Sequence, residues 1–276
     1  MINPFYRHGI FANSESMEWL ADQLDKTGRF GEPNNENYSW RDEVVRSGLE
    51  LADRVLAADD ESKVLLIGHS QGGLVSRVAA VALAGTQLGT RGQFTERIVQ
   101  WQCDRGAPNK ALGKLAVVTI ATPNAGALTA GQISVAAELL GRTIFKAVHL
   151  LDRECELLDL RTPRLFQEFQ NWRVAARYLS VSGVCVNRYS RGLIRDLAEL
   201  WPVRCVSVRF DIPNDLVVED SSTDLRQSLI RPEIDLAHSY RHVRAYPKSI
   251  SLNHRDVRKS PEVVNVIIDN LDWLFA

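Results

Sequence analysis

Short apolar runs alternate along the chain with segments whose apolar residues recur at helical spacing. Two of the runs, KVLLI at residues 63–67 and LAVVTI at residues 115–120, contain no regular alternation of apolar and polar positions. Such runs are typical of parallel strands that helices cover on both faces. Weaker strands are predicted at residues 178–184 and 242–246, and residues 2–7 are expected to form at most a short first strand.

Amphipathic helices are predicted between these strands. One follows Asn13 and ends at Gly28, a second covers about residues 41–57, and a third begins at about Gly72. The chain ends in an apolar helix over residues 263–274. Strands that alternate with helices indicate a mostly parallel sheet between two helix layers, which is the α/β class.

The chain has no internal repeat and no low-complexity segment, so we predict a single domain over residues 1–276. Residues 126–171 contain amphipathic helical stretches without a convincing strand, and residues 187–211 form a second irregular stretch. Both are interpreted as additions above one sheet. Residues 29–39 are polar and are expected to form a loop.

The composition, with 45% hydrophobic and 24% charged residues among 276, is that of an ordinary globular protein. A chain of this length buries enough surface to form a core without disulfides or metals. The 33 Lys and Arg residues nearly balance the 34 Asp and Glu residues. A broad basic surface for nucleic acid is therefore not expected.

The spacing of the cysteines indicates whether a zinc site is present, and the N-terminal sequence indicates where in the cell the protein is expected. The four cysteines never form a C-x-x-C pair, so reduced and mostly buried thiols are expected, and no zinc site is predicted. The N-terminus lacks a basic stretch followed by an apolar segment, and no apolar run approaches about 18 residues. We therefore expect a cytoplasmic protein without a transmembrane segment.

The segment Gly68-His69-Ser70-Gln71-Gly72 matches the pattern G-x-S-x-G. At an average glycine usage of about 7%, this pattern occurs by chance in roughly one chain in ten of this length. Its place directly after a predicted strand and before a predicted helix gives it weight, because a nucleophile elbow needs that context. In such a tight turn the serine backbone is strained, and the crossing backbones leave no room for side chains at Gly68 and Gly72. The alternative is a glycine-rich turn whose serine only caps the helix.

A serine hydroxyl becomes a nucleophile only beside a base, and a third group must orient that base. In chains with this elbow the order is serine, acid, histidine. His254 lies in a polar turn before the last helix and is the predicted base. His238 and His242 lie before or within a predicted strand, so they are interpreted as solvated or structural.

Two further elements complete the predicted chemistry. Asp215 is the predicted acid, because the apolar run LVV follows it and can anchor a buried carboxylate; Asp211 and Asp220 are alternatives. The oxyanion hole needs two N–H donors, of which one is the backbone of Gln71 next to the nucleophile. The other is expected from Ile10, after the His-Gly turn, with Phe11 as the alternative.

Together, these residues resemble the α/β-hydrolase superfamily. The resemblance rests on His8-Gly9-Ile10, the elbow at 68–73, Ala-Thr-Pro-Asn-Ala-Gly at 121–126, Asp-Leu-Val-Val at 215–218, and His254. More narrowly, they are similar to the serine esterase and lipase branch, including lipase-like proteins and the GPI inositol-deacylase type. The resemblance implies a triad of Ser70, Asp215 and His254, an oxyanion hole from Ile10 and Gln71, and a helical cap over residues 126–171.

The leading hypothesis is a serine hydrolase of carboxylic esters that needs no metal or cofactor. Its expected substrate is a small-molecule or lipid acyl ester, and the apolar stretches at residues 133–160 favour a medium or long acyl chain. A thioesterase, an amidase or an acyltransferase would use the same triad. A catalytically inactive fold used as an interaction module is a further alternative, and the weak first strand, with Pro4 and Arg7, is its only support.

Overall fold

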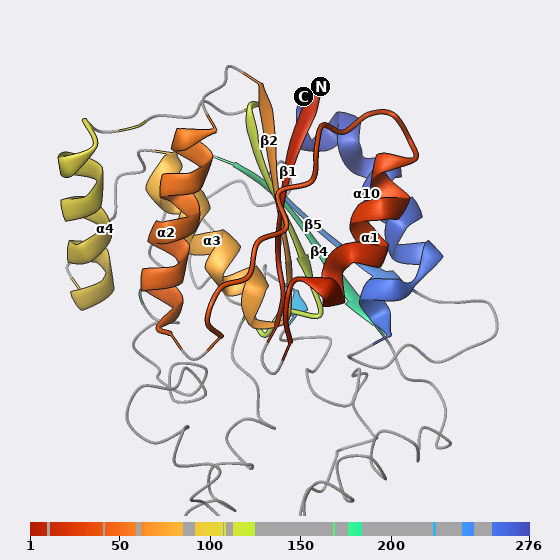
Figure 1. Cartoon of the computed structure of the whole chain (residues 1–276), viewed down its shortest axis with the longest axis horizontal. Helices are drawn as coiled ribbons and strands as arrows, with labels where there is room; N and C mark the ends of the chain where they lie inside the picture. The colour runs from red at the N-terminus through yellow and green to blue at the C-terminus, as the bar shows by residue number, and fades with distance from the viewer. Residues whose placement is uncertain are drawn as a thin grey trace, which may run out of the picture.

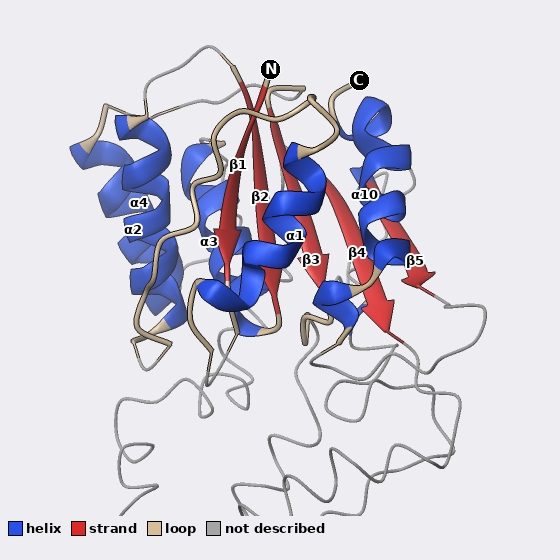
Figure 2. Ribbon diagram, turned by 45° about the vertical axis from the view of Figure 1, so that its right-hand side comes forward, coloured by secondary structure: helices blue, strands red, loops and turns tan. Residues whose placement is uncertain are grey.

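The computed structural model describes residues 1–9, 12–40, 42–58, 62–84, 92–106, 108, 113–124, 168, 176–183, 223–224, 239–245 and 256–276. Within them, a sheet lies between two layers of helices (Figure 1; Figure 2). The chain therefore has the α/β architecture that the alternation of strands and helices predicts.

The sheet has five strands in the order β1-β2-β3-β4-β5, and every neighbouring pair is parallel. The strands are β1 (Ile2–Arg7), β2 (Lys63–His69), β3 (Leu115–Ile120), β4 (Arg177–Gly183) and β5 (Tyr240–Ala245). Because all of them run in the same direction, their carboxyl ends meet at one edge of the sheet. The prediction of a parallel sheet is confirmed, with small shifts at the ends of β4 and β5.

The first strand is better supported than the sequence suggests. Two parallel bridges, from Ile2 to Phe30 and from Phe5 to Asn34, place part of the expected 29–39 loop along the outer edge of β1. The Pro4 carbonyl accepts a hydrogen bond from the Asn34 N–H at 3.0 Å, so the N–H that proline lacks would have pointed to this outer side. Pro4 therefore leaves the ladder between β1 and β2 intact.

One face of the sheet is covered by α2 (Val44–Ala57) and α3 (Gln71–Leu83), with α4 (Gln93–Asp104) packed against both. The opposite face is covered by α1 (Glu15–Asp25) and α10 (Pro261–Leu274), as Figure 1 shows. Helix α3 is buried all round, which fits its central position and its largely apolar sequence.

Helix α4 was not predicted from the sequence. Its buried residues include Phe94, Ile98 and Trp101, which follow one another at helical spacing, so the periodic signal was present. The carboxylate of Glu168 accepts hydrogen bonds from the Thr95 N–H at 2.7 Å and the Thr95 hydroxyl at 2.8 Å. Glu168 therefore caps the start of this helix. It is the one described residue of the predicted 126–171 cap, which otherwise lies outside the described residues, as does the 187–211 stretch.

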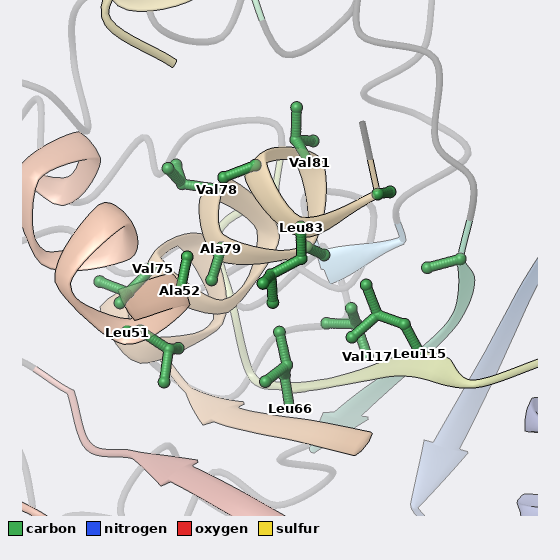
Figure 3. Close-up of a cluster of buried hydrophobic side chains, with 14 of the residues drawn as sticks. Leu51, Ala52, Leu66, Val75, Val78, Ala79, Val81, Leu83, Leu115 and Val117 are labelled. Carbon is green, nitrogen blue, oxygen red and sulfur yellow. The ribbon is translucent and has the colours of Figure 1, made fainter. Parts of the chain in front are cut away.

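The core consists of two apolar clusters, one on each face of the sheet. Figure 3 shows part of the cluster on the α2–α3 face, where Leu66 and Val117 of the sheet meet Leu83 of α3. Of the cysteines, only Cys103 is described, and its thiol is free but exposed rather than buried. Among the described residues, no helix combines the length and apolar character that a membrane span requires.

Candidate active site

Ser70 lies on the turn that joins β2 to α3, at the edge where the carboxyl ends of the strands meet. Its backbone has φ 55° and ψ −128°, a conformation that non-glycine residues rarely adopt and that costs about 1–3 kcal/mol. Hydrogen bonds hold this geometry, because the Ser70 N–H donates to the Ile120 carbonyl at 2.9 Å and the Ser70 carbonyl accepts from the Gly73 N–H at 3.0 Å. The strain therefore falls on the one serine that the motif singles out.

The glycines around Ser70 stand where backbones cross closely. A Cβ atom at Gly68 would lie 2.2 Å from the Gly72 carbonyl oxygen, and one at Gly72 would lie 2.3 Å from the Arg7 carbonyl oxygen. Neither contact can be relieved by turning a flexible side chain, since both involve backbone atoms. The elbow is therefore fitted against the end of β1 as well as against its own helix.

The His-Gly turn after β1 passes directly beside the serine side chain. A Cβ atom at Gly9 would lie only 2.7 Å from the Cβ of Ser70. The Ser70 side chain is nearly buried, and its residue is 8% exposed. Gln71, whose backbone N–H is a predicted oxyanion donor, is the first residue of α3, where the helix dipole favours negative charge. Ile10 and Phe11 lie outside the described residues.

His8 is buried at the end of β1. Its Nδ1 donates to the Gly9 carbonyl at 2.9 Å, and its ring stacks on Tyr38 with 4.4 Å between the ring centroids. Burial lowers the pKa of His8 below its ordinary value, and the positive charges of Arg7 and Arg258 lower it further. His8 is therefore a neutral, fixed part of this turn at neutral pH.

A buried polar cluster lies at the end of β3, next to the elbow helix. Arg77 of α3 donates to the backbone carbonyl of Asn124 at 3.1 Å and to its side-chain oxygen at 3.3 Å. The Asn124 side chain in turn donates to the Thr223 carbonyl at 2.7 Å. Burial lowers the pKa of Arg77 to about 10, so Arg77 remains charged at neutral pH. This cluster joins a segment that follows the candidate acids to the edge of the sheet that carries Ser70.

Asp215, Asp211, Asp220, His238 and His254 lie outside the described residues, so the proposed triad partners stay predictions. The described elements on either side of residue 254 are nevertheless informative. Strand β5 ends at Ala245, at the same edge as Ser70, and the 3-10 helix η3 (Val257–Lys259) packs against α1. The charge of Arg258 within η3 also acts on His8.

His242 lies within β5, where the sequence placed it. Its Nδ1 is 2.9 Å from the Ser180 hydroxyl, and its Nε2 is 3.4 Å from the Ser182 hydroxyl. The Ser180 hydroxyl also donates to the Arg241 carbonyl at 3.3 Å, and Ser180 is fully buried. The contacts of His242 with Ser180 and Ser182 therefore join β4 to β5 and have an ordinary structural explanation.

The residues that sequence reasoning missed are Tyr38, Trp40 and Arg77, and Asn124 was noted only as part of the motif at 121–126. The signals for them were weak, because Tyr38 and Trp40 follow a polar stretch without periodicity, and a lone arginine in an apolar helix indicates no particular contact. Among the described residues, no three potential metal ligands gather at one place.

The parallel sheet, its two helix layers and a strained serine at the carboxyl edge define a class of α/β proteins with a nucleophile elbow. A sequence model of the alpha/beta hydrolase family matches residues 20–247. The chain belongs to this family. Family membership and the elbow together support an enzyme of the α/β-hydrolase type.

Solved structures show the same fold at low sequence identity. The lipase BlEst2 of Bacillus licheniformis in its mature form is similar with a TM-score of 0.56 and 15% identity, over 97% of this chain and 90% of that one. The same lipase in its propeptide form has a TM-score of 0.54 and 15% identity, over 96% of this chain and 49% of that one. No curated protein sequence matches this chain.

Proposed function

We propose that this protein is a serine hydrolase that cleaves carboxylic esters through an acyl-enzyme on Ser70. The observation that carries the proposal is the backbone of Ser70, which is held at φ 55° between β2 and α3. Strain of this kind is kept where the surrounding structure enforces it, and it presents the hydroxyl above the edge of the sheet. A serine that only capped α3 would not need this conformation, and Ser70 makes no side-chain cap hydrogen bond.

In the proposed reaction, the Ser70 oxygen attacks the ester carbonyl carbon while His254 takes the hydroxyl proton. The backbone N–H groups of Ile10 and Gln71 stabilise the negative charge that develops on the carbonyl oxygen. His254 then gives the proton to the leaving alcohol as the bond between carbonyl carbon and alkoxy oxygen breaks. Water, activated by His254, releases the acid and restores Ser70, while Asp215 orients the imidazole.

The described neighbours of the two predicted partners support this assignment. His254 precedes Asp256 by two residues, which limits the distance between their Cα atoms to about 7 Å. The turn at Asp256 leads directly into η3, whose Arg258 acts on His8 beside the elbow. Thr223 lies eight residues after Asp215 and is hydrogen-bonded to Asn124 at the end of β3.

The substrate class is proposed from the sequence of the cap and from the fold. Apolar residues at 133–160 would shield a medium or long acyl chain, and one structurally similar protein is a lipase. A lipase-like role, including the GPI inositol-deacylase type, and a cytoplasmic location belong to this proposal. The inactive-fold alternative loses its motivation, because β1 is fully paired with β2 and is also bridged to residues 30 and 34.

Labelling with a fluorophosphonate tests the nucleophile, because this reagent reacts with activated serines. We expect the intact protein to be labelled at Ser70 and to hydrolyse p-nitrophenyl esters, and S70A to lose both properties. The matched control is S180A, which removes a buried serine hydroxyl that lies 2.9 Å from Nδ1 of His242. Labelling that persists in S70A, or that is lost in S180A, would contradict the assignment of Ser70.

The same preparation separates the competing reactions. Rates with matched ester, thioester and amide substrates distinguish an esterase from a thioesterase or an amidase, and added alcohol acceptors reveal acyl transfer. A series of p-nitrophenyl esters of increasing chain length tests the acyl preference, and a sharp preference for acetate would contradict the proposed lipid-like substrate.

A further inference from the structure

Residues 35–40 form neither helix nor strand and follow the bridge at Asn34. They contact both the residue after β1 and the first residue of α3. The Tyr38 hydroxyl donates to the His8 carbonyl at 2.7 Å. Two residues further along, the Trp40 carbonyl accepts a hydrogen bond from the Gln71 side chain at 3.0 Å. One short segment therefore binds the chain just before Ile10 and also the residue whose backbone is the second donor.

The 35–40 segment also binds the backbone of Ser14, just before α1. The Asn37 side-chain oxygen accepts a hydrogen bond from the Ser14 N–H at 2.6 Å, and the Asn35 side chain donates to the Ser14 carbonyl at 2.9 Å. His8 and Ser14 are therefore both bonded to the same segment.

The position of the His8 carbonyl is fixed from two sides. The Tyr38 hydroxyl binds this oxygen, and the Tyr38 ring stacks on the His8 side chain. On the other side, a Cβ atom at Gly72 would lie 2.5 Å from the same oxygen, so the backbone of the first turn of α3 packs against it. Loss of the Tyr38 hydroxyl removes the first of these two constraints.

The segment itself is anchored to the rest of the molecule. Glu36 forms an ion pair with Arg54 of α2, and the Ser39 carbonyl accepts a hydrogen bond from the Asp42 N–H at 3.0 Å, just before that helix. The Gln71 side chain, which Trp40 binds, is completely buried. Such anchoring is what preorganised electrostatic stabilisation needs, because donors held in place cost no reorganisation during the reaction.

We propose that residues 35–40 are positioning residues that hold the His8 carbonyl and Gln71, on which the two predicted oxyanion donors depend, in place beside Ser70. This inference rests on the proposed serine hydrolase function. It assigns a catalytic consequence to Tyr38 and Asn37 through the hydrogen bonds that they form with His8 and Ser14. Their effect on the reaction passes through the backbone of the His-Gly turn.

The first test compares Y38F with Y178F, using p-nitrophenyl ester hydrolysis and thermal unfolding. Y38F removes the hydrogen bond to His8, and a small displacement of a donor can cost up to about a hundredfold in rate. We expect kcat to fall by about tenfold to a hundredfold with KM changed less than about threefold, because the donors act mainly in the transition state. Y178F removes a buried tyrosine hydroxyl that has no hydrogen-bond partner among the described residues, and kcat should not change.

Inhibition by an alkyl boronic acid separates positioning from a general structural effect. Its tetrahedral adduct on Ser70 places an oxygen in the oxyanion hole, so its inhibition constant should rise by about the factor by which kcat/KM falls. The second comparison is N37A with N37D. The aspartate keeps an oxygen acceptor for the Ser14 N–H near the start of α1, so N37D should lose much less kcat than N37A.

The results of these experiments distinguish failure of the positioning role from failure of the proposed hydrolase function. If the intact protein is labelled at Ser70 and hydrolyses esters, but Y38F and N37A keep full kcat or lose only thermal stability, then the positioning role is wrong and the hydrolase stands. If KM rises and kcat does not fall, the segment binds substrate and does not hold the donors. If the intact protein is neither labelled nor active on esters, the proposed function fails and this inference fails with it.

Discussion

At the scale of single residues, the edge of the sheet that carries Ser70 depends on three positions. At each of them, close contact between backbones determines which residue can be accommodated. Ser70 keeps a positive φ, while Gly68 and Gly72 leave room for carbonyl groups that would otherwise collide with a Cβ atom. Gly72 is the more informative glycine, because its neighbours include the carbonyls of Arg7 and His8 rather than only the elbow itself. A change there should therefore affect the turn that leads to Ile10.

We predict that G72A lowers both stability and activity. The added methyl group would lie 2.3 Å from the Arg7 carbonyl oxygen, so α3 and β1 must move apart. Overpacking of this kind typically costs about 1–3 kcal/mol in the free energy of unfolding. Urea unfolding and ester hydrolysis measure the two effects.

G28A is a suitable control for G72A. A Cβ atom at Gly28 meets nothing within 4 Å, although its φ of +67° strains any other residue. G28A should thus reduce stability and leave kcat of the folded protein unchanged. Equal losses of kcat in both variants would contradict a specific role for the contact at Gly72.

At the scale of secondary-structure elements, the strands and turns that could be predicted are those whose pattern lies within a few consecutive residues. Strands β2 and β3 are continuous apolar runs, and the glycines and serine of the elbow directly follow the first of them. Helix α4 was not predicted, although its buried residues Phe94, Ile98 and Trp101 recur at helical spacing. The bridges of residues 30 and 34 to β1 could not be predicted in this way, since polar residues can pair through their backbones without any pattern of side chains.

In the predicted site, too, features formed by adjacent residues could be predicted, and contacts between distant residues could not. The elbow could be predicted because its glycines and serine are adjacent in sequence. The contacts of Tyr38 with His8 and of Asn124 with Thr223 join residues 30 and 99 positions apart. Such pairs depend on how loops meet after the sheet has formed, and one sequence contains no signal that links them.

Helix α4 provides a prediction at this scale, because its start is bonded to a residue from the predicted cap region. E168A removes the acceptor for the Thr95 N–H and hydroxyl, and loss of a helix cap typically costs about 0.5–2 kcal/mol. We expect a lower midpoint of urea unfolding for E168A. E32A, which changes an exposed loop glutamate, should have no comparable effect, and equal behaviour of the two variants would contradict the capping role.

At the scale of the whole molecule, the parallel order of the strands brings distant parts of the chain to one edge. The ends of β1 and β2 carry the His-Gly turn and Ser70, and the end of β3 carries the cluster around Asn124. Strand β5 ends at the same edge and precedes the segment with His254. The two core clusters hold the strands in this register from opposite faces, so the geometry of the edge depends on the packing of both.

This dependence predicts a global effect for a core residue of β2. Leu66 is fully buried between the sheet and α3 (Figure 3), and truncation of such a leucine typically costs about 2–5 kcal/mol. We expect L66A to lower the free energy of unfolding by this amount, while V99A, at a position that is 42% exposed, changes it little. Since β2 leads directly into the elbow, L66A should also be labelled more slowly at Ser70 under conditions where it remains folded. An L66A protein that loses stability and keeps the full labelling rate would show that the edge tolerates a change in the packing beneath it. The core of the sheet would then not control the geometry at Ser70.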